Sequence, residues 1–343
     1  MDGYDYAFLK DSWVEMDLSR KLSYIARVQE KCDVWRTLYP SAYSKMETST
    51  FYESVLYSNA VEHIVLEQDR IVELIAGAEP VTETEMKFTG YCEALTMSRD
   101  GMQDECLNPE MVCDLHYALM HRYCSEAGTL RRRSGPHVGY GMMSAVRHPA
   151  DPVEIPQKLK ELCDSCNEIL CDDRVEPLVA IAYIMLDFMN LSPFRNGNGR
   201  MYRILLQHLL IYSGYDFIRY VSLDRKIYED AIGHTNALYR SSMKSDSIEY
   251  TPFLISLIDE LWKAAKDMDT MFPDPSLGRM SKGERVKHAV SSFDGWFTKS
   301  DVSSILPDIA PVTIQQELSD MVSNGQLMRD GSTKACRYAH SQN

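Results

Sequence analysis

Apolar positions recur at helical spacing from the start of the chain to about residue 265. Runs of alternating β-branched residues, which would indicate strands, are few, and Gly, Pro and Asn mark the turns between the periodic segments. The pattern predicts helices over residues 50–72, 82–97, 109–123, 155–170, 176–189 and 200–212, after a mixed amphipathic beginning over residues 1–48. The fold class that follows for the main part of the chain is all-α.

The segment 176–189 is apolar on nearly every face, which is typical of a helix buried at the centre of a domain. Its longest uninterrupted apolar run, Leu178 to Leu186, is about half as long as a bilayer requires and ends at Asp187, so no membrane span is expected. A sharp polar break over residues 190–199 separates it from the next apolar helix, which Gly214 closes.

Other segments interrupt the helical pattern. Residues 130–156 are rich in Arg, Gly, Met and Pro, which predicts a loop or short hairpin and a candidate lid. A Met-, Asp- and Pro-rich stretch over 267–281 is typical of a linker. Beyond it, a capping box at 298–301, a helix opened by Ala310-Pro311 and an Asp330-Gly331 hairpin turn give the order of a winged helix-turn-helix. The predicted organisation is an N-terminal helical region (1–100), a core domain (101–266), a linker (267–281) and a winged-helix domain (282–343).

Composition narrows the class of protein. The chain has 343 residues, 45% hydrophobic and 25% charged, which is ordinary for globular domains. The start, MDGYDYAFLKDSW, lacks the basic and apolar regions of a signal peptide, so a cytoplasmic location is expected. The formal net charge of −14 argues against broad, nonspecific binding of nucleic acid, which requires a basic surface.

Nine cysteines are present, and in a reducing compartment we expect free thiols rather than a disulfide framework. Cys163-Asp-Ser-Cys166, followed by Cys171, is the one local pattern that metal or redox chemistry could use. No second pair and no His cluster lies at zinc-site spacing, so a structural role for these cysteines is the stronger interpretation.

The most informative stretch is residues 192–203, Ser-Pro-Phe-Arg-Asn-Gly-Asn-Gly-Arg-Met-Tyr-Arg, between two apolar helices. Gly197-Asn-Gly199 places flexible backbone beside a helix N-terminus, where unpaired N–H groups attract an anion. Arg200 and Arg203 lie three apart on the first turn and suit phosphate oxygens. The pattern predicts a polyphosphate site; the alternative is a Gly-rich turn followed by two solvated arginines.

This stretch resembles the Fic family signature, His-Pro-Phe-x-Asp/Glu-Gly-Asn-Gly-Arg-x-x-Arg. The matching positions are Pro193, Phe194, Gly197, Asn198, Gly199, Arg200 and Arg203. Similarity extends to residues 79–85 with the following helix, to residues 135–156 as the family's β-hairpin flap, and to the winged-helix tail, and is weakest in residues 1–48. The resemblance implies the all-helical Fic fold and a protein adenylyltransferase, which moves AMP from ATP onto a Ser, Thr or Tyr hydroxyl of a protein substrate.

The resemblance also implies residue roles. The nucleotide-binding set would be Phe194, Gly197, Asn198, Gly199, Arg200 and Arg203, with Asn198 and the glycine amides at the α-phosphate and the arginines at the β- and γ-phosphates. The flap near residues 138–144, including Val138, Gly139, Tyr140 and Gly141, would align a target peptide by strand addition. ATP and Mg²⁺ are the implied cofactors.

An inhibitory helix with the pattern Ser/Thr-x-x-x-Glu-Gly/Asn belongs to the same family. Ser58 to Glu62 fit this pattern, within a helix predicted at about 50–72, but His63 stands where Gly or Asn is expected. The resemblance implies that Glu62 pairs with Arg203 and keeps it from the γ-phosphate. Without that resemblance, Glu62 would be interpreted as an ordinary surface charge.

Two departures fall on chemical positions. Ser192 replaces the family's general-base His, and serine cannot take up a proton near neutral pH. Loss of a positioned base costs about 10²–10⁴-fold in rate. Asn196 replaces the acidic residue that helps to hold Mg²⁺, so a weakened metal site is expected. His137 and His148, in the flap, are alternative bases that no spacing supports, and a third histidine, His208, is expected to be buried.

Three hypotheses follow. The first is a nucleotide-binding adenylyltransferase of weak or lost activity that acts on a protein substrate. The second is a pseudoenzyme that signals to a regulatory partner, and a homodimer is compatible with either. The third is a DNA-binding regulator that acts through residues 282–343.

The composition of the tail gives limited support to the third hypothesis. Residues 281–343 carry seven basic and seven acidic side chains. Arg329, Lys334 and Arg337 cluster on the wing, but residues 312–322, the expected recognition helix, offer Thr313, Gln315 and Gln316 and no basic residue. Docking of a protein is therefore the stronger expectation for this unit.

Overall fold

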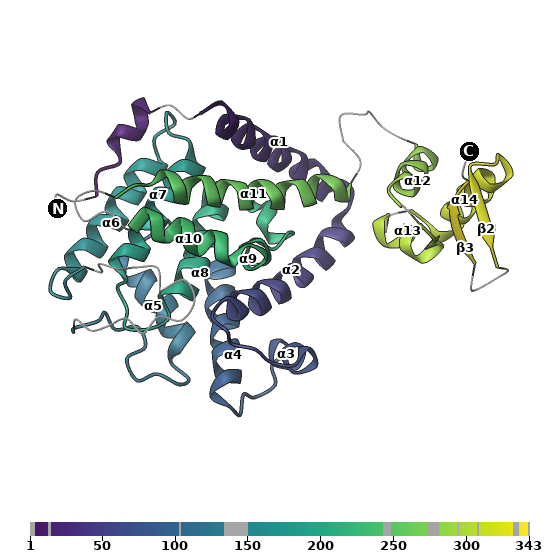
Figure 1. Ribbon diagram of the computed structural model, residues 1–343. Helices are drawn as coiled ribbons and strands as arrows, with labels where there is room; N and C mark the ends of the chain where they lie inside the picture. The colour runs from purple at the N-terminus through teal and green to yellow at the C-terminus, as the bar shows by residue number, and fades with distance from the viewer. Residues whose placement is uncertain are drawn as a thin grey trace.

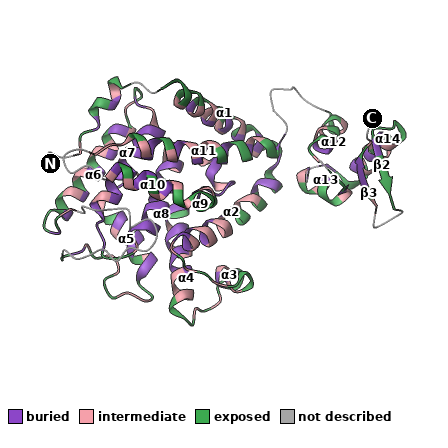
Figure 2. Ribbon diagram, viewed as in Figure 1, coloured by how far each residue is buried: buried purple, intermediate pink, exposed green. Residues whose placement is uncertain are grey.

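Two helices at the centre of the main helical body, α7 (Pro177–Leu191) and α8 (Asn198–Tyr212), are buried almost throughout (Figure 1). Helices that are apolar on nearly every face need neighbours on every side. The structure supplies them, because α6 (Ile155–Leu170) and α11 (Thr251–Met271) both pack against α7, and α7 packs against α8. Figure 2 shows the buried residues concentrated here, whereas α1 on the outside carries exposed positions.

The computed structural model describes residues 4–12, 15–102, 104–133, 150–242, 248–272, 281–293, 295–306, 309–331 and 336–341. The remaining elements of the main body are the 3-10 helix η1 (Ala7–Asp11), α1 (Met16–Leu38), α2 (Pro40–Val61), α3 (Gln68–Ile75), α4 (Glu83–Thr96), the π-helical turn η2 (Met97–Gly101), α5 (Pro109–Met120), the 3-10 helix η4 (Asp216–Arg219), α9 (Leu223–Glu229) and α10 (Ala231–Ser242). The prediction of an all-α main domain is confirmed, since the strands of the described residues all lie beyond residue 296.

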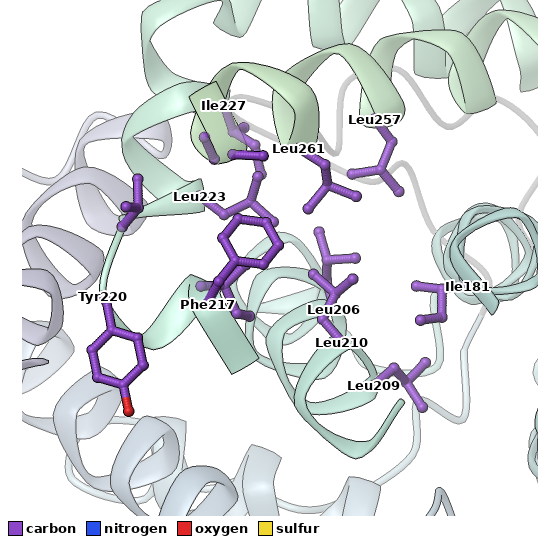
Figure 3. Packing of buried hydrophobic residues seen from close by; sticks show 14 of the residues in the cluster. Ile181, Leu206, Leu209, Leu210, Phe217, Tyr220, Leu223, Ile227, Leu257 and Leu261 are labelled. Atoms are coloured by element: carbon purple, nitrogen blue, oxygen red, sulfur yellow. The ribbon is translucent and has the colours of Figure 1, made fainter. Parts of the chain in front are cut away.

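The core beneath α8 is formed by aliphatic and aromatic side chains from several helices (Figure 3). Leu206 and Leu210 of α8 face Phe217, Leu223 and Leu261. These side chains are 2% exposed or less. Because α8 is packed along its whole length, its first turn has a fixed position, and that turn carries the candidate phosphate site.

The first hundred residues are more regular than predicted. Residues 1–48 hold α1 and the beginning of α2, with the break at Tyr39 set by Pro40, which stands at the first turn of α2. The single helix predicted over 50–72 is wrong, because α2 ends at Val61 and α3 begins at Gln68. In this region α1 packs on α11, α2 on α9 and α4 on α5, so residues 1–100 share one core with the predicted core domain.

Helix boundaries agree with the sequence where side-chain caps mark them. Thr82 and Glu85 form the reciprocal capping box that opens α4. Asn108 accepts a hydrogen bond from the backbone N–H of Met111 and opens α5, with Pro109 following at the first helical position. At the other end of the body, α11 continues to Met271, so the linker predicted from residue 267 begins only after it.

The C-terminal unit follows the main body in the chain (Figure 1), and its Arg285 lies over the ring of Tyr39, 4.7 Å from the ring centroid, at the junction of α1 and α2. It contains α12 (Lys282–Ser291), β1 (Phe297–Thr298), α13 (Lys299–Ile305), α14 (Pro311–Ser323), β2 (Leu327–Asp330) and β3 (Arg337–His340). The strands form an antiparallel sheet in the order β1-β3-β2.

Two details of this unit differ from the sequence prediction. Strand β1 was not predicted, because two residues are too short for a periodic signal. The hairpin turn is longer than Asp330-Gly331 implies, because Asp330 pairs with Arg337. The element order is the predicted one, and the winged-helix assignment itself stays a prediction. Within the described part of the chain, no helix combines the length and apolar character needed to cross a bilayer.

Candidate functional site

The loop between α7 and α8 is held in one shape by its own side chains. The Asn198 side chain accepts a hydrogen bond from the backbone N–H of Phe194 (3.0 Å) and donates one to the Phe194 carbonyl oxygen (2.7 Å). Left-handed backbone at Ser192 (φ 45°) and Gly197 (φ 82°) turns the chain at each end of this brace. The buried amide of Asn198 therefore fixes the loop from within, and Gly197 supplies the φ that most residues avoid.

Arg131 holds the same loop from outside. Its Nε donates to the Ser192 carbonyl oxygen (2.7 Å), its Nη2 to that of Leu191 (3.2 Å), and its backbone N–H to that of Pro193 (2.9 Å). A guanidinium here satisfies carbonyl groups that the end of α7 leaves without helical partners. Sequence reasoning missed Arg131, because it lies some sixty residues from the loop within a segment that has no periodic pattern.

His116 supports the other side of the loop. Its Nδ1 accepts a hydrogen bond from the backbone N–H of Gly128 (2.9 Å), so Nε2 carries the proton and donates to the Asn196 carbonyl oxygen (3.1 Å). The ring stacks on Phe194, with centroids 3.6 Å apart. Burial lowers the pKa of His116 to about 4, so the ring is neutral at pH 7. This histidine positions the loop and was not singled out from the sequence.

The carboxylate of Glu62 lies at the start of α8. Glu62, just after the end of α2, lies so close to Gly199 that a Cβ added there would collide with Glu62 Oε1. The first N–H groups of a helix have no acceptor within it and attract negative charge. Glu62 thus places a negative charge beside the helix N-terminus, and glycine at residue 199 makes the close approach feasible.

Arg203 is fully buried and binds the end of α2. Its Nε donates to Ser58 Oγ (2.6 Å), and its Nη2 donates to the Ser58 carbonyl oxygen (2.8 Å) and to Glu62 Oε1 (3.0 Å). The Glu62 side chain keeps 14% exposure, whereas that of Arg203 has none. The structure therefore brings together the predicted pair, Glu62 and Arg203, and adds Ser58 as a second partner of the guanidinium.

Arg200 turns to a different neighbour. Its Nη2 donates to Tyr123 Oη (2.7 Å), in the turn after α5, and the guanidinium also contacts Sδ of Met120 (3.4 Å), the last residue of α5. Its Nη1 is buried without a hydrogen-bond partner among the described residues. A buried donor without an acceptor is costly, and an incoming anion would satisfy it.

The two departures from the family signature have clear placements. Ser192 is fully buried, and its hydroxyl donates to the Met189 carbonyl oxygen, so it is engaged with the end of its own helix. Asn196 is exposed, and its carbonyl oxygen is the acceptor for His116. Among the described residues, no group of three or more His, Cys, Asp or Glu side chains could hold a metal ion. Asn196 alone is a poor fit for Mg²⁺, because its amide is neutral.

Of the remaining predicted residues, the structure describes His208 but not those of the flap. His208 is buried as expected, with Nε2 near the Glu105 carbonyl oxygen (2.8 Å), and burial lowers its pKa. The flap residues Val138, Gly139, Tyr140 and Gly141, and the alternative bases His137 and His148, lie outside the described residues.

The backbone at His63 shows why the inhibitory pattern has Gly or Asn at this position. It adopts a left-handed backbone (φ 57°) directly after Glu62, where α2 stops. Gly and Asn adopt this conformation most readily, which gives the family preference at this position a physical cause. His63 keeps the turn at some conformational cost, and Glu62 still reaches Arg203.

All nine cysteines are free thiols, as predicted. Cys163 and Cys166 are buried on α6, and Cys106 Sγ lies 3.8 Å from Cys166 Sγ. In the C-terminal unit, Arg337 pairs with Asp330 (3.0 Å), and Arg329 Nε lies 3.1 Å from Cys336 Sγ. These contacts engage two of the three basic side chains on which the DNA hypothesis depends.

Comparison with known proteins adds the following. Residues 106–210 match the model of the Fic/DOC family. No curated protein matches the chain. A Fic family protein from Desulfovibrio desulfuricans G20 is similar in structure, with a TM-score of 0.60 and 15% identity over 97% of this chain and 98% of that chain.

Two further solved structures are similar. A Fic domain-containing signaling protein from Bacteroides thetaiotaomicron VPI-5482 gives a TM-score of 0.59 at 17% identity, over 72% of this chain and 95% of that chain. Fic-1 from C. elegans gives 0.59 at 16% identity, over 73% and 71%. Identities this low establish a shared fold alone.

Proposed function

Residues 106–210 form a Fic/DOC family domain, and from that premise we propose that the chain binds ATP at the start of α8 and that Glu62 competes with the nucleotide's phosphates. It is of the protein adenylyltransferase type, with transfer of AMP to a protein hydroxyl weakened or lost through Ser192. A regulatory role without catalysis is the second candidate, and the buried, internally bonded hydroxyl of Ser192 favours it.

The observation that carries the proposal is the Glu62 carboxylate, which lies against Gly199 and is bonded to Arg203. An internal carboxylate at a helix N-terminus marks a site adapted to anions. Arg200 supports the same conclusion, since one of its nitrogen atoms is buried without a described partner. When Glu62 withdraws, the first-turn amides and both guanidiniums become available to phosphate oxygens.

Each residue of the proposed site has a defined task. Arg200 and Arg203 would bind the outer phosphates and the glycine amides the inner one, whereas the Asn198 side chain is already used to brace the loop. Mg²⁺ bound to ATP would offset phosphate charge. Since Asn196 supplies no negative charge to hold the metal, we propose that it arrives with the nucleotide.

The proposed chemistry is transfer of the AMP group of ATP to a protein hydroxyl. A substrate hydroxyl oxygen attacks the α-phosphorus, the bond to the bridging oxygen breaks, pyrophosphate leaves, and the hydroxyl proton must pass to a base. Ser192 cannot accept that proton at neutral pH, and its own hydroxyl donates to Met189. Positioning and charge stabilisation by the loop and arginines would remain and could support slow transfer.

Calorimetric titration with ATP tests the binding proposal. Glu62→Gly removes the competing carboxylate and is expected to tighten ATP binding about tenfold or more, which corresponds to about 1.4 kcal/mol. Glu67→Gly, at an exposed position five residues further on, is the matched control and should bind as the parent does. Equal ATP affinities for all three proteins, or no binding by Glu62→Gly, would contradict the proposal.

Radiolabel transfer from α-labelled ATP separates the enzyme from the regulator. In the Glu62→Gly background, Ser192→His restores a titratable base at a left-handed position that histidine tolerates. The expected gain in transfer is about 10²–10⁴-fold. Label without the added histidine supports an active enzyme, label only with it supports the regulator, and label from neither protein removes the transferase proposal.

For residues 282–343 we propose docking of a protein, a second copy of the chain included, ahead of DNA. The pairing of Arg337 with Asp330 and the contact of Gln315 with Tyr338 (3.2 Å) support this order, because they engage side chains that DNA would need. A mobility-shift assay with duplex DNA at several salt concentrations tests it. Salt-dependent binding that Arg329→Ala weakens would favour DNA instead.

A further inference from the structure

Arg203 has a second carboxylate neighbour, which no motif indicated. Asp224, in the first turn of α9, lies with Oδ1 4.0 Å from Arg203 Nε. Its side chain is 1% exposed, so this is a buried charge beside a buried charge. The sequence offered no signal for it, because Ser222-Leu-Asp224 is an ordinary helix start, with Ser222 as the cap.

Fixed hydrogen bonds hold the Asp224 carboxylate in place. Gln207, one turn after Arg203 on α8, donates from Nε2 to Asp224 Oδ2 (2.7 Å), and Tyr91 of α4 donates to Oδ1 (3.5 Å). Gln207 is itself fixed by Arg99, which donates to its Oε1. Every one of these side chains is buried.

Four elements besides α9 present polar groups to Asp224. They are Arg203 and Gln207 on α8, Tyr91 on α4, the Ser54 hydroxyl on α2 and Arg99 on η2. Burial raises the pKa of Asp224 to about 6, and Arg203 is the largest influence in the opposite direction. The carboxylate is therefore ionised at neutral pH, although burial opposes ionisation.

The two carboxylates near Arg203 differ in how they are held. Glu62 follows the last turn of α2, keeps partial exposure, and accepts a hydrogen bond from Arg203. Asp224 lies in the core and is anchored by Gln207 and Tyr91, so it cannot withdraw without breaking that network. Of these two carboxylates, Glu62 is free to withdraw and Asp224 is fixed.

We propose that Asp224 is a positioning residue for phosphate recognition: it keeps the Arg203 guanidinium directed toward the start of α8 when Glu62 gives way to an anion. The inference rests on the proposed function, because it concerns how the same site remains ordered after the inhibitory contact opens. A buried guanidinium that loses its only ionic partner would reorient toward water or other acceptors. Asp224 prevents this and still leaves the guanidinium edge that Glu62 occupied open to phosphate.

The test compares ATP with adenosine in full-length chains that carry Glu62→Gly. Adding Asp224→Asn is expected to weaken ATP binding about tenfold, which corresponds to about 1.4 kcal/mol, and to leave adenosine binding unchanged, because adenosine presents no phosphate to Arg203. A purely structural role would lower both affinities together. Equal ATP affinity with and without Asp224→Asn, or parallel loss of ATP and adenosine, overturns the inference.

Two further variants keep the test decisive. Gln207→Met removes the amide that anchors Asp224 without removing its charge, and a several-fold loss of ATP affinity is expected even if Asp224→Asn fails to fold; an unchanged affinity overturns the inference. Asp187→Asn is the matched control, a buried carboxylate bound by Tyr6 (2.7 Å) and Tyr250 (2.9 Å) and not by arginine, and ATP affinity should not change. No ATP binding by Glu62→Gly alone would overturn the proposed function and this inference with it.

Discussion

The two flanks of the first turn of α8 treat similar side chains in opposite ways. On the flank formed by α2 and α9, Arg203 lies between the carboxylates of Glu62 and Asp224. On the flank formed by α5, the partners of Arg200 among the described residues are the neutral Tyr123 and Met120. The two guanidiniums lie three residues apart, yet Arg203 has an ionic environment and Arg200 a neutral one.

The difference shows how the proposed site can be closed without being dismantled. In the proposed function, the Glu62 carboxylate would take one phosphate contact away from Arg203, and it lies over Gly199. Arg200, which has no carboxylate partner among the described residues, keeps its charge in place. Opening the site then requires displacement of one side chain, Glu62, at the end of one helix.

Replacement of each arginine by methionine gives the largest expected contrast. Arg203→Met leaves Asp224 buried without its ionic partner and should lower the free energy of unfolding by about 3–5 kcal/mol. Arg200→Met removes a guanidinium with neutral partners and one unpaired nitrogen, and should cost about 1 kcal/mol or less. Urea unfolding of both variants measures this contrast, and equal losses would show that the flanks do not differ in ionic character.

The pH dependence of stability should have opposite signs on the two flanks. The pKa of Asp224 is raised to about 6, so between about pH 4 and 6 the folded protein keeps a proton on Asp224 that the unfolded chain loses. The contribution of Asp224 to the free energy of unfolding therefore falls as pH rises through this window. His116, on the α5 flank, has its pKa lowered to about 4, so its contribution falls as pH drops from about 6.5 to 4. Each of these pKa differences between the folded and unfolded chain corresponds to a change of roughly 3 kcal/mol in the free energy of unfolding.

Unfolding free energies of the parent, Asp224→Asn and His116→Gln, measured from pH 4 to 7, test this expectation. Subtracting each variant from the parent isolates one group, which removes the contribution of Asp187, another buried carboxyl with its pKa raised by burial to about 7. Difference curves with the same slope for both variants, or without slope, would contradict the assignment.

The sequence predicted the elements that local chemistry marks and missed those that depend on distant neighbours. The cap at Thr82, the start of α5 and the glycine turn before α8 each follow from a few adjacent residues. Arg131, His116 and Asp224 act on the site across dozens of residues, and nothing in their local sequence distinguishes them.

The break between α2 and α3 shows the same limit. Apolar spacing continues across residues 61–67, and a residue of ordinary helical character, His63, adopts the left-handed turn. Where α2 stops, Glu62 pairs with Arg203, a contact between distant segments that no local pattern reveals. The motif therefore predicted the pair of Glu62 and Arg203 but not the residues that hold the loop in place.

A smaller effect should come from relaxing His63. Because a left-handed conformation costs an ordinary residue about 1 kcal/mol, His63→Gly should stabilise the fold by up to about that amount and strengthen the ionic flank. The urea midpoint should rise for His63→Gly and not for His63→Ala, which retains a Cβ. A rise for both variants would point to the imidazole rather than the backbone.

Hydrogen exchange at the first turn of α8 tests the central claim most directly. In the Glu62→Gly chain, ATP should slow exchange of the Gly199 and Arg200 amides, and adenosine should not, because the claim is that these amides and the two arginines bind phosphate. Protection by ATP confined to other segments, with these amides exchanging as in the free protein, would contradict it.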